Sequence, residues 1–396
     1  MTAVQFGAGN IGRGFLGQLY FESGYRTIFI DVAEPVVRAL NQRGRYTVRV
    51  VGDRPRDIEV QNVLGILTSD ADAVRKAVFE ADVMGTSVGV AHLEAVARLM
   101  APGIGDRLRQ NRPPVDVLLC ENKLNAAEYM RFEIAKCLPM ELLGLYTEKV
   151  GFVEASIGRM VPVMSPEQRA ADPLLVCVEE YCELPVDAEG FRGPIPPIRH
   201  LLPKKPFTAY IERKLFVHNA GHATAAYLGH LRDHEYVWQA MEDPRVRPVV
   251  DAAMTESCQG LHRKYSTPME ELNDHAEDLK RRFSNKALGD QVVRVGGDPL
   301  RKLGHDDRLI GAMEMCLSQG VDPVALAIGT AAALRFDAKG DPSAARVQEA
   351  VRNSGVEGAL TTLCGINPDS RLIDLVSSAF MSLDSLLCLT NKVNSS

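Results

Sequence analysis

The sequence predicts an α/β fold for the first half of the chain and an all-helical fold for the second half. A short apolar strand at residues 3–6 leads directly into a glycine-rich turn and then into helix-spaced apolar residues. Strand-like and helix-like segments alternate as far as Leu184, which is typical of a doubly wound parallel sheet. Beyond a proline-rich stretch that begins at Gly193, helical spacing prevails and strand signals are few.

The composition is that of an ordinary globular protein. With 396 residues, 46% hydrophobic and 24% charged, the chain is long enough for two domains with full cores. A formal net charge of -6 argues against a nucleic-acid partner bound over a broad basic face. Eight cysteines without a C-x-x-C pair are typical of reduced cytosolic thiols. Because no run of about 18 apolar residues and no signal peptide is present, we expect a cytoplasmic protein without a membrane partner. The sequence specifies no oligomeric partner.

The turn after the first strand has the spacing G-x-G-x-x-G and predicts a Rossmann-type dinucleotide site. Gly7 permits the tight turn, Gly9 lets the backbone approach a pyrophosphate, and Gly12 lets helix and strand pack closely. Asn10 and Ile11 open the helix, whose N-terminus offers unpaired N–H groups to an anion. A glycine turn in another kind of α/β protein is the alternative.

The second expected strand ends at Asp31, nineteen residues after Gly12, and its carboxylate would accept hydrogen bonds from the ribose hydroxyls of an adenosine. A 2′-phosphate would not be tolerated beside this carboxylate, so the expected cofactor is NAD and not NADP. Thr86 and Val88 lie at the C-terminal end of the fourth expected strand and would flank the same cofactor. Taken singly, each is explained nearly as well by a plain strand-to-helix turn.

The proline-rich stretch divides the chain into two expected domains, residues 1–195 and 196–396. Prolines from Pro194 to Pro206 should exclude regular structure there and mark the boundary. The expected strands are 3–6, 27–30, 46–51, 81–89 with its exit turn, 115–120 and 174–184, and residues 151–161 form another apolar segment. The expected helices are 11–19, 35–42 and 71–79 in the first domain, and 207–231, 245–264, 269–283, 306–317, 323–334, 344–352 and 372–387 in the second.

The reacting groups are expected in the first helix of the second domain. At roughly 100° per residue, Lys214, His222 and Asn219 lie near 0°, 80° and 140° around a helix axis, so all three can project toward one side. They could supply a base, a donor and a further polar contact. A solvated lysine is the alternative for Lys214 alone. His218 and His222 could instead bind zinc, but H-E-x-x-H lacks its glutamate here and no third ligand is evident, so we expect no metal.

Several segments together resemble the polyol-specific long-chain dehydrogenases, the mannitol dehydrogenase family. The resemblance covers residues 1–335, and its combined motifs are far more specific than the glycine turn alone. It rests on residues 6–15, 120–122, 151–153, 282–285, 293–296, 299–303 and 307–310, and on the K-x4-N-x2-H pattern of Lys214, Asn219 and His222.

This resemblance implies a metal-independent, NAD-dependent hydride transfer that interconverts D-mannitol 1-phosphate and D-fructose 6-phosphate. It implies that Lys214 is the general acid/base and that Asn122 and Asn219 hold the developing oxyanion. Elementary chemistry agrees, because burial lowers the pKa of a lysine from its ordinary value near 10.4 toward neutral pH. Fixed amide donors also stabilise negative charge on oxygen without changing protonation state.

The resemblance further implies that His222, Arg294 and Lys302 contact the substrate. One position departs from the family, which usually has an aspartate where this sequence has Gly158. The departure removes an acceptor for substrate hydroxyls and leaves two enzymatic alternatives open. These are an unphosphorylated polyol and a hexonate of the mannonate or altronate type, whose carboxylate would need the same cations. A non-catalytic NAD-binding protein is a third alternative, disfavoured by the intact Lys214, Asn122 and Asn219.

Overall fold

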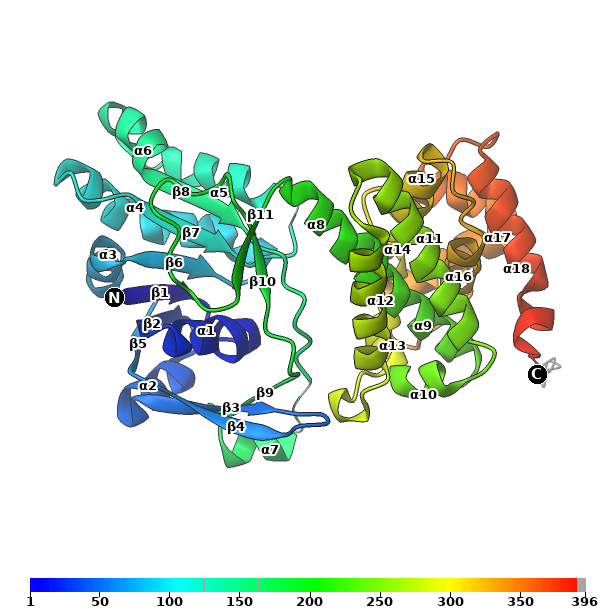
Figure 1. Cartoon of the computed structure of the whole chain (residues 1–396), viewed down its shortest axis with the longest axis horizontal. Coiled ribbons are helices and arrows are strands. Elements are labelled where there is room, and N and C mark those ends of the chain that lie inside the picture. The colour runs from blue at the N-terminus through cyan, green and yellow to red at the C-terminus, as the bar shows by residue number, and fades with distance from the viewer. Residues whose placement is uncertain (124, 163, 165, 390–396) are drawn as a thin grey trace. The chain divides into compact units, whose positions relative to one another are not determined.

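The computed structural model describes residues 1–123, 125–162, 164 and 166–389, and the chain divides into two compact units, Met1–Tyr210 and Ile211–Ser396 (Figure 1). The division falls later than residue 195 because strand β11 (Leu201–Lys204) pairs in parallel with β10 (Leu184–Asp187). The prediction that the prolines exclude regular structure was therefore wrong for β11. Pro203 is accommodated because β11 belongs to a sheet of only two strands, where one edge needs no N–H donor.

The N-terminal unit is built on a six-stranded parallel sheet, which confirms the predicted Rossmann-type fold. Its strand order is β5-β2-β1-β6-β7-β8. The inner strands are nearly continuous runs of buried residues, as expected where helices and loops cover both faces. The strands are β1 (Thr2–Phe6), β2 (Arg26–Asp31), β5 (Val63–Leu67), β6 (Val83–Thr86), β7 (Val115–Leu119) and β8 (Val150–Glu154).

A second, three-stranded sheet in the same unit contains the strand expected at residues 46–51. β3 (Arg45–Val50) pairs with β4 (Arg56–Gln61) and β9 (Val176–Val178), and β5 takes its place in the main sheet. Neither β4 nor β5 was predicted. In β4 only Val60 is buried and Ile58 is half-buried, so its apolar alternation is limited to two residues. β5 follows after Asn62 alone, whose φ of 58° breaks the strand between them.

Helices cover the main sheet on both faces. One face packs against α3, α4, α5 and α6, and the other against a π-helical segment, α1 and the β10–β11 pair. The helices are the π-helical segment Gly12–Gly17, α1 (Gln18–Glu22), α2 (Glu34–Arg43), α3 (Ala71–Glu80), α4 (Leu93–Arg109), α5 (Ala126–Ala135), α6 (Leu143–Lys149), α7 (Pro166–Ala171) and the 3-10 turns Val90–His92 and Met140–Leu142.

The described residues of the C-terminal unit form helices and loops, as predicted. α9 and α16 pack closely in its core, and glycine at position 329 permits this approach. An added Cβ at Gly329 would lie only 2.5 Å from Thr224 Oγ1. The helices are α8 (Phe207–Arg213), in which the division falls, the π-helical segment Lys214–Asn219, α9 (Ala220–Leu231), α10 (Val237–Glu242), α11 (Arg247–Tyr265), α12 (Met269–Phe283), the 3-10 turn Lys286–Leu288, α13 (Val292–Gly296), α14 (Pro299–Lys302), α15 (Ile310–Ser318), α16 (Val324–Leu334), α17 (Pro342–Cys364, kinked at Gly355) and α18 (Arg371–Leu387).

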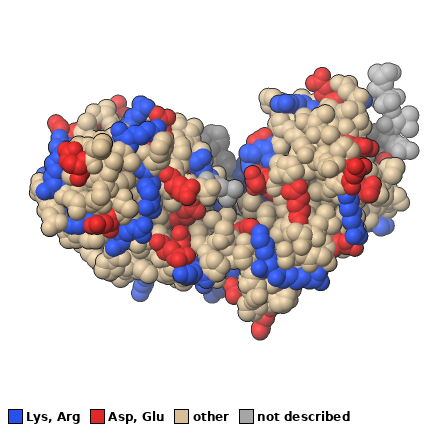
Figure 2. Space-filling view, turned by 90° about the horizontal axis from the view of Figure 1, so that it is seen from above, with Lys and Arg blue, Asp and Glu red and all other residues tan. Residues whose placement is uncertain are grey.

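The surface of each unit mixes both signs of charge. On the face drawn in Figure 2, Lys and Arg side chains are interspersed with Asp and Glu. Among the described residues, none of the helices combines the length and the apolar character needed to cross a bilayer.

Candidate active site

The glycine turn joins β1 to the first helical segment. Gly7 has φ +94°, a conformation that side chains disfavour, and its N–H donates to Ile30 O at 2.8 Å. A side chain at Gly12 would lie 1.9 Å from Gly7 O, so this position must be glycine for the turn to close. At Gly9 an added Cβ would meet nothing within 4 Å. The protein's own packing therefore requires Gly7 and Gly12, whereas Gly9 leaves open space for a ligand.

The helix after the turn begins as the π-helical segment Gly12–Gly17, whose residues are all buried. Within it, Arg13 donates from Nε to Ala8 O and from Nη1 to Leu174 O, each at 2.6 Å. Burial lowers the pKa of this guanidinium. Arg13 thus fixes the glycine turn to a segment far along the chain. Sequence reasoning assigned it no role.

Asp31 lies at the end of β2, beside the glycine turn. Its Oδ2 accepts from Ala8 N at 2.6 Å and its Oδ1 accepts from Ala33 N at 2.8 Å. Each carboxylate oxygen has two lone pairs, so both can still accept a ribose hydroxyl. The open space at Gly9 and the half-buried Asp31 together fit a dinucleotide.

The ends of β6 and β7 are joined by a side chain that sequence reasoning left without a role. The Glu121 carboxylate accepts from Val88 N at 2.8 Å and from Gly89 N at 2.9 Å. Burial raises the pKa of Glu121 in spite of these bonds. Thr86 is buried at the end of β6, and Asn122 is exposed directly after Glu121. The sequence feature that could have indicated a role for Glu121 is its position, as an acidic residue just after a buried strand.

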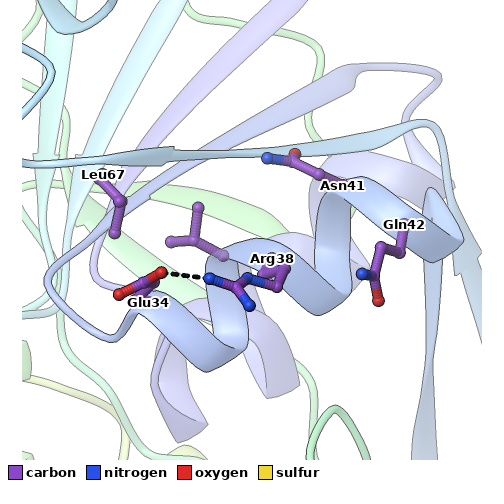
Figure 3. Close-up of a pocket in the computed structure, with 6 residues that line it drawn as sticks. Glu34, Arg38, Asn41, Gln42 and Leu67 are labelled. Atoms are coloured by element: carbon purple, nitrogen blue, oxygen red, sulfur yellow. Dashed lines mark hydrogen bonds and ion pairs between the residues drawn. The ribbon is translucent and has the colours of Figure 1, made fainter.

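A hollow beside α2 lies outside the predicted set of residues. Figure 3 shows Arg38 turned toward Glu34 along this helix, and the two form an ion pair one turn apart. The side chain of Asn41 holds the adjacent strand, accepting from Gly65 N at 2.7 Å and donating to Gly65 O at 3.0 Å. The lining residues are Glu34, Val37, Arg38, Asn41, Gln42 and Leu67. These contacts explain the hollow as part of the helix surface.

In the C-terminal unit, Lys214 begins the second π-helical segment and Asn219 ends it. Both are half-buried. A turn closed by i→i+5 hydrogen bonds holds more residues than an α-turn, so it brings residues five apart closer to one side. The angular positions predicted for a regular helix do not apply here. In the wider turn, Lys214 and Asn219 lie closer to the same side of the helix than they would in a regular α-helix.

His218 and His222 both pack against Phe283. The His222 ring stacks on Phe283 with centroids 4.8 Å apart and an interplanar angle of 7°, and the His218 ring lies 5.7 Å from it. Burial, with the nearby charge of Arg282, lowers the pKa of His218 well below its ordinary value, so this ring is a neutral core side chain. In the described part of the chain, no three His, Cys, Asp or Glu side chains are grouped to hold a metal ion.

Asp290 links two of the predicted substrate residues. Its Oδ2 lies 3.2 Å from His222 Nε2, and its Oδ1 pairs with Arg294. Burial alone would raise the pKa of Asp290, but His222 and Arg294 outweigh burial and hold it below the ordinary value. The structure therefore brings His222 and Arg294 together through a carboxylate that spacing along the sequence did not reveal.

Lys302 is buried at the end of α14, with a relative exposure of 5%. Burial, followed by the charges of Arg308 and Arg301, lowers its pKa to about 8. The chain after Lys302 packs on the π-helical segment, since a Cβ at Gly311 would lie 3.2 Å from Phe216 Cε1.

Gly158 belongs to the N-terminal unit, and the ring of Tyr181 occupies the space beside it. A Cβ at Gly158 would lie 3.1 Å from Tyr181 Cε1. An aspartate could be accommodated here only if this ring moved. The Tyr181 ring therefore packs against the position that distinguishes this sequence from the expected pattern.

Two family models match the chain in succession. The Mannitol dehydrogenase Rossmann domain matches residues 1–200, and the Mannitol dehydrogenase C-terminal domain matches residues 207–360. The chain belongs to the mannitol dehydrogenase family. Among members named mannitol-1-phosphate 5-dehydrogenase, the Bacillus licheniformis protein is 37% identical over 379 residues, covering 96% of this chain and 99% of the relative. The Bacillus subtilis protein is 37% identical over 370 residues, covering 92% and 96%.

Two solved structures of polyol dehydrogenases share the fold. Pseudomonas fluorescens mannitol 2-dehydrogenase, in a ternary complex with NAD and D-mannitol, aligns with a TM-score of 0.75 at 17% identity. A D-sorbitol dehydrogenase in substrate-free form aligns with a TM-score of 0.83 at 16% identity. Each alignment covers 98% of this chain and 94% of the other.

Proposed function

We propose that this protein catalyses the NAD-dependent interconversion of D-mannitol 1-phosphate and D-fructose 6-phosphate. The observation that carries the proposal is the similarity over nearly the whole length to relatives named for this substrate, at 37% identity for the Bacillus licheniformis protein. The presence of Lys214, Asn219 and Asn122 supports catalysis over a non-catalytic NAD-binding role.

The cofactor residues are assigned to the glycine turn and the neighbouring strand ends. Gly9 allows the pyrophosphate to approach, and the helix start at Asn10 and Ile11 supplies backbone N–H groups. Asp31 accepts from the adenosine ribose. Gly7 and Gly12 hold the turn, and Thr86 and Val88 flank the dinucleotide. When bound, NAD supplies or accepts the hydride.

The proton is assigned to Lys214. As the ketose carbonyl is reduced, negative charge develops on its oxygen, and the Lys214 ammonium donates a proton there; in the reverse direction the neutral amine removes it. The amides of Asn219 and Asn122 are the hydrogen-bond donors assigned to the negative charge that develops on oxygen. This mechanism uses no metal ion.

The substrate is held by His222, Arg294 and Lys302 in this proposal. Lys302 supplies a positive charge for an anionic substrate, whereas Arg294 would contact the substrate while paired with Asp290, whose carboxylate also lies 3.2 Å from His222 Nε2. A free polyol would gain little from them. A hexonate would use them through its carboxylate, and this alternative rests on the missing aspartate at Gly158.

A substrate panel tests the proposal. Mannitol 1-phosphate, mannitol, mannonate and altronate are oxidised with NAD and with NADP, and kcat/KM is measured for each pair. We expect the highest value for mannitol 1-phosphate with NAD. A higher value for a hexonate or for mannitol would replace the proposed substrate, and binding of NADH without turnover of any substrate would favour the non-catalytic role.

A further inference from the structure

A basic cluster lies around the loop between α14 and α15. It consists of Arg301, Lys302 and Arg308, and the two carboxylates beside it are Asp298 and Asp307. The loop folds back on itself, because Leu309 N donates to Lys302 O at 3.4 Å and so places Arg308 near Lys302. Three cations against two carboxylates leave a surplus of one positive charge.

Arg301 forms ion pairs with both carboxylates. Arg301 Nε donates to Asp298 Oδ2 at 2.9 Å, and its Nη1 donates to Asp307 Oδ2 at 2.8 Å. The guanidinium of Arg301 is therefore neutralised from both sides. Its side chain is also half exposed, at 53%. Arg301 thereby positions the Asp307 carboxylate.

Arg308 is oriented by Asp307 but keeps donors to spare. Asp307 Oδ1 accepts from both the backbone N and the Nε of Arg308, at 2.7 Å each. Among the described residues, no acceptor bonds the two terminal nitrogens of this guanidinium. The planar fork that remains matches two oxygens of a phosphate.

Lys302 carries the surplus charge. Its side chain is buried, and within the described ranges no carboxylate pairs with it. A buried ammonium without a partner is costly, and an anion that enters the cluster would remove that cost. The lowered pKa of Lys302 is the expected sign of such an unbalanced site.

Arg294 differs from both, because it is committed to a protein carboxylate. It pairs with Asp290, which also contacts His222. Its charge is balanced before any ligand binds.

We propose that Lys302 and Arg308 together bind the phosphate group of the substrate, while Arg294 remains paired with Asp290. This inference rests on the proposed function and adds Arg308 to the site. The cluster packs beside the segment that begins at Lys214, through the contact of Gly311 with Phe216. A phosphate bound there would anchor one end of a sugar chain whose carbonyl reaches the lysine.

The test compares Arg308→Gln with wild type on fructose 6-phosphate and on fructose, with inorganic phosphate as a competitive inhibitor. We expect Arg308→Gln to raise KM for fructose 6-phosphate and the inhibition constant of phosphate by about ten-fold or more. Turnover at saturation and kcat/KM for fructose should stay near wild type. Arg308→Lys keeps the positive charge but lacks the two terminal nitrogens, so its KM and phosphate inhibition constant should lie between those of wild type and Arg308→Gln. Arg335→Gln, which removes an arginine paired with Asp384, is the matched control.

Unchanged KM and phosphate inhibition in Arg308→Gln would overturn the inference, as would equal losses on both substrates. Should Arg308→Gln not fold, wild-type phosphate inhibition in Arg308→Lys and Lys302→Gln would overturn it equally. Arg294→Ala should reduce kcat/KM for both substrates alike. A wild type that prefers fructose would contradict the proposed function itself, whereas a wild type that prefers fructose 6-phosphate with an unaltered Arg308→Gln contradicts only the inference.

Discussion

The two units each contain a π-helical segment beside their predicted functional residues, and they differ in what the segment exposes. Gly12–Gly17 is buried throughout and packs so closely that a side chain at Gly17 would lie 2.2 Å from Tyr46 Oη. Lys214–Asn219 buries only its middle residues and leaves its two polar ends half-buried. The N-terminal segment is thus fully enclosed by packing, whereas the C-terminal segment keeps two polar side chains partly accessible. Substitutions in the first should affect the fold and cofactor binding, and those in the second should affect chemistry.

The largest effect is expected at Lys214, where turnover should fall while cofactor binding stays unchanged. Lys214→Ala should lower turnover by about 10² to 10⁴-fold, the usual contribution of a general acid/base. NADH affinity, measured by fluorescence titration, should stay near wild type because the residue acts on the substrate oxygen. Lys264→Ala, which removes a lysine paired with Glu212, is the control. A Lys214→Ala variant with more than half the wild-type rate would assign the proton to another group.

Asp31 should determine the choice of cofactor. A 2′-phosphate facing this carboxylate would meet repulsion of several kcal/mol, so kcat/KM with NAD should exceed that with NADP by about 100-fold or more. Asp31→Ser should narrow this ratio. Because Asp31 also accepts from Ala8 N and Ala33 N, the variant should melt at a lower temperature as well. Equal specificity constants for the two cofactors in wild type would contradict the assignment.

Gly12 and Gly9 separate packing from ligand approach within one turn. Gly12→Ala puts a methyl group against Gly7 O and should destabilise the protein by about 1–3 kcal/mol. Gly9→Ala has open space and should leave the melting temperature unchanged while it weakens NADH binding. Urea denaturation and NADH titration of both variants check this. Tight NADH binding by Gly9→Ala would show that the open space is not used by the cofactor.

Lys302 should make substrate affinity depend on pH. Its pKa is about 8, so the ammonium loses its charge as the pH rises through 8, and kcat/KM for fructose 6-phosphate relative to fructose should fall by up to about ten-fold. The other charged groups that act on Lys302 are Arg301, Arg308, Asp298 and Asp307. Lys302→Arg should remove the decline. A ratio that is constant from pH 7 to pH 9 in wild type would exclude Lys302 from phosphate binding.

The lowered pKa of Lys302 also predicts that the protein becomes more stable as the pH rises above 8. The folded-state pKa of Lys302 lies below the ordinary 10.5, so the folded state is penalised at neutral pH and the penalty disappears as the pH rises from 8 to 10.5. Inorganic phosphate should offset the penalty at pH 7 by pairing the ammonium. It should therefore raise the melting temperature of wild type more than that of Lys302→Met.

The smallest effect is expected at Gly158. Gly158→Asp restores the family's usual carboxylate but forces the Tyr181 ring to move, since the Cβ would lie 3.1 Å from it. We expect a modest rise in activity on mannitol 1-phosphate, larger when Tyr181→Ala is combined with it. A fall in activity in both variants would show that this protein uses the glycine as it stands.

The parts of the fold that sequence predicted are those with a local pattern. The glycine turn, Asp31 and the helices of the C-terminal unit follow from spacing and periodicity. β4 was missed because it is mostly exposed, with Val60 its only buried residue. β11 was missed because its edge position tolerates Pro203. Both strands depend on partners in the folded chain, which composition does not reveal.

The candidate site divides in the same way. Lys214, Asn219 and His222 were found by their spacing and by the family resemblance. Arg13 and Glu121 were missed because each bonds residues distant along the chain, as in the bond from Arg13 to Leu174 O. Asp290 was missed because its contact with His222 is also distant, although its other partner, Arg294, lies one helical turn away. The π-helical turn was also missed, because apolar spacing over six residues does not distinguish it from an α-helix.

The transfer of deuterium from cofactor to product tests the central claim most directly. The wild-type protein is incubated with fructose 6-phosphate and NADH deuterated at the transferring position, and the product is examined by mass spectrometry and NMR. We expect mannitol 1-phosphate with one deuterium on the carbon that carried the carbonyl, and with the added oxygen-bound proton drawn from solvent. The absence of a deuterated sugar phosphate, or a product other than mannitol 1-phosphate, would contradict the account.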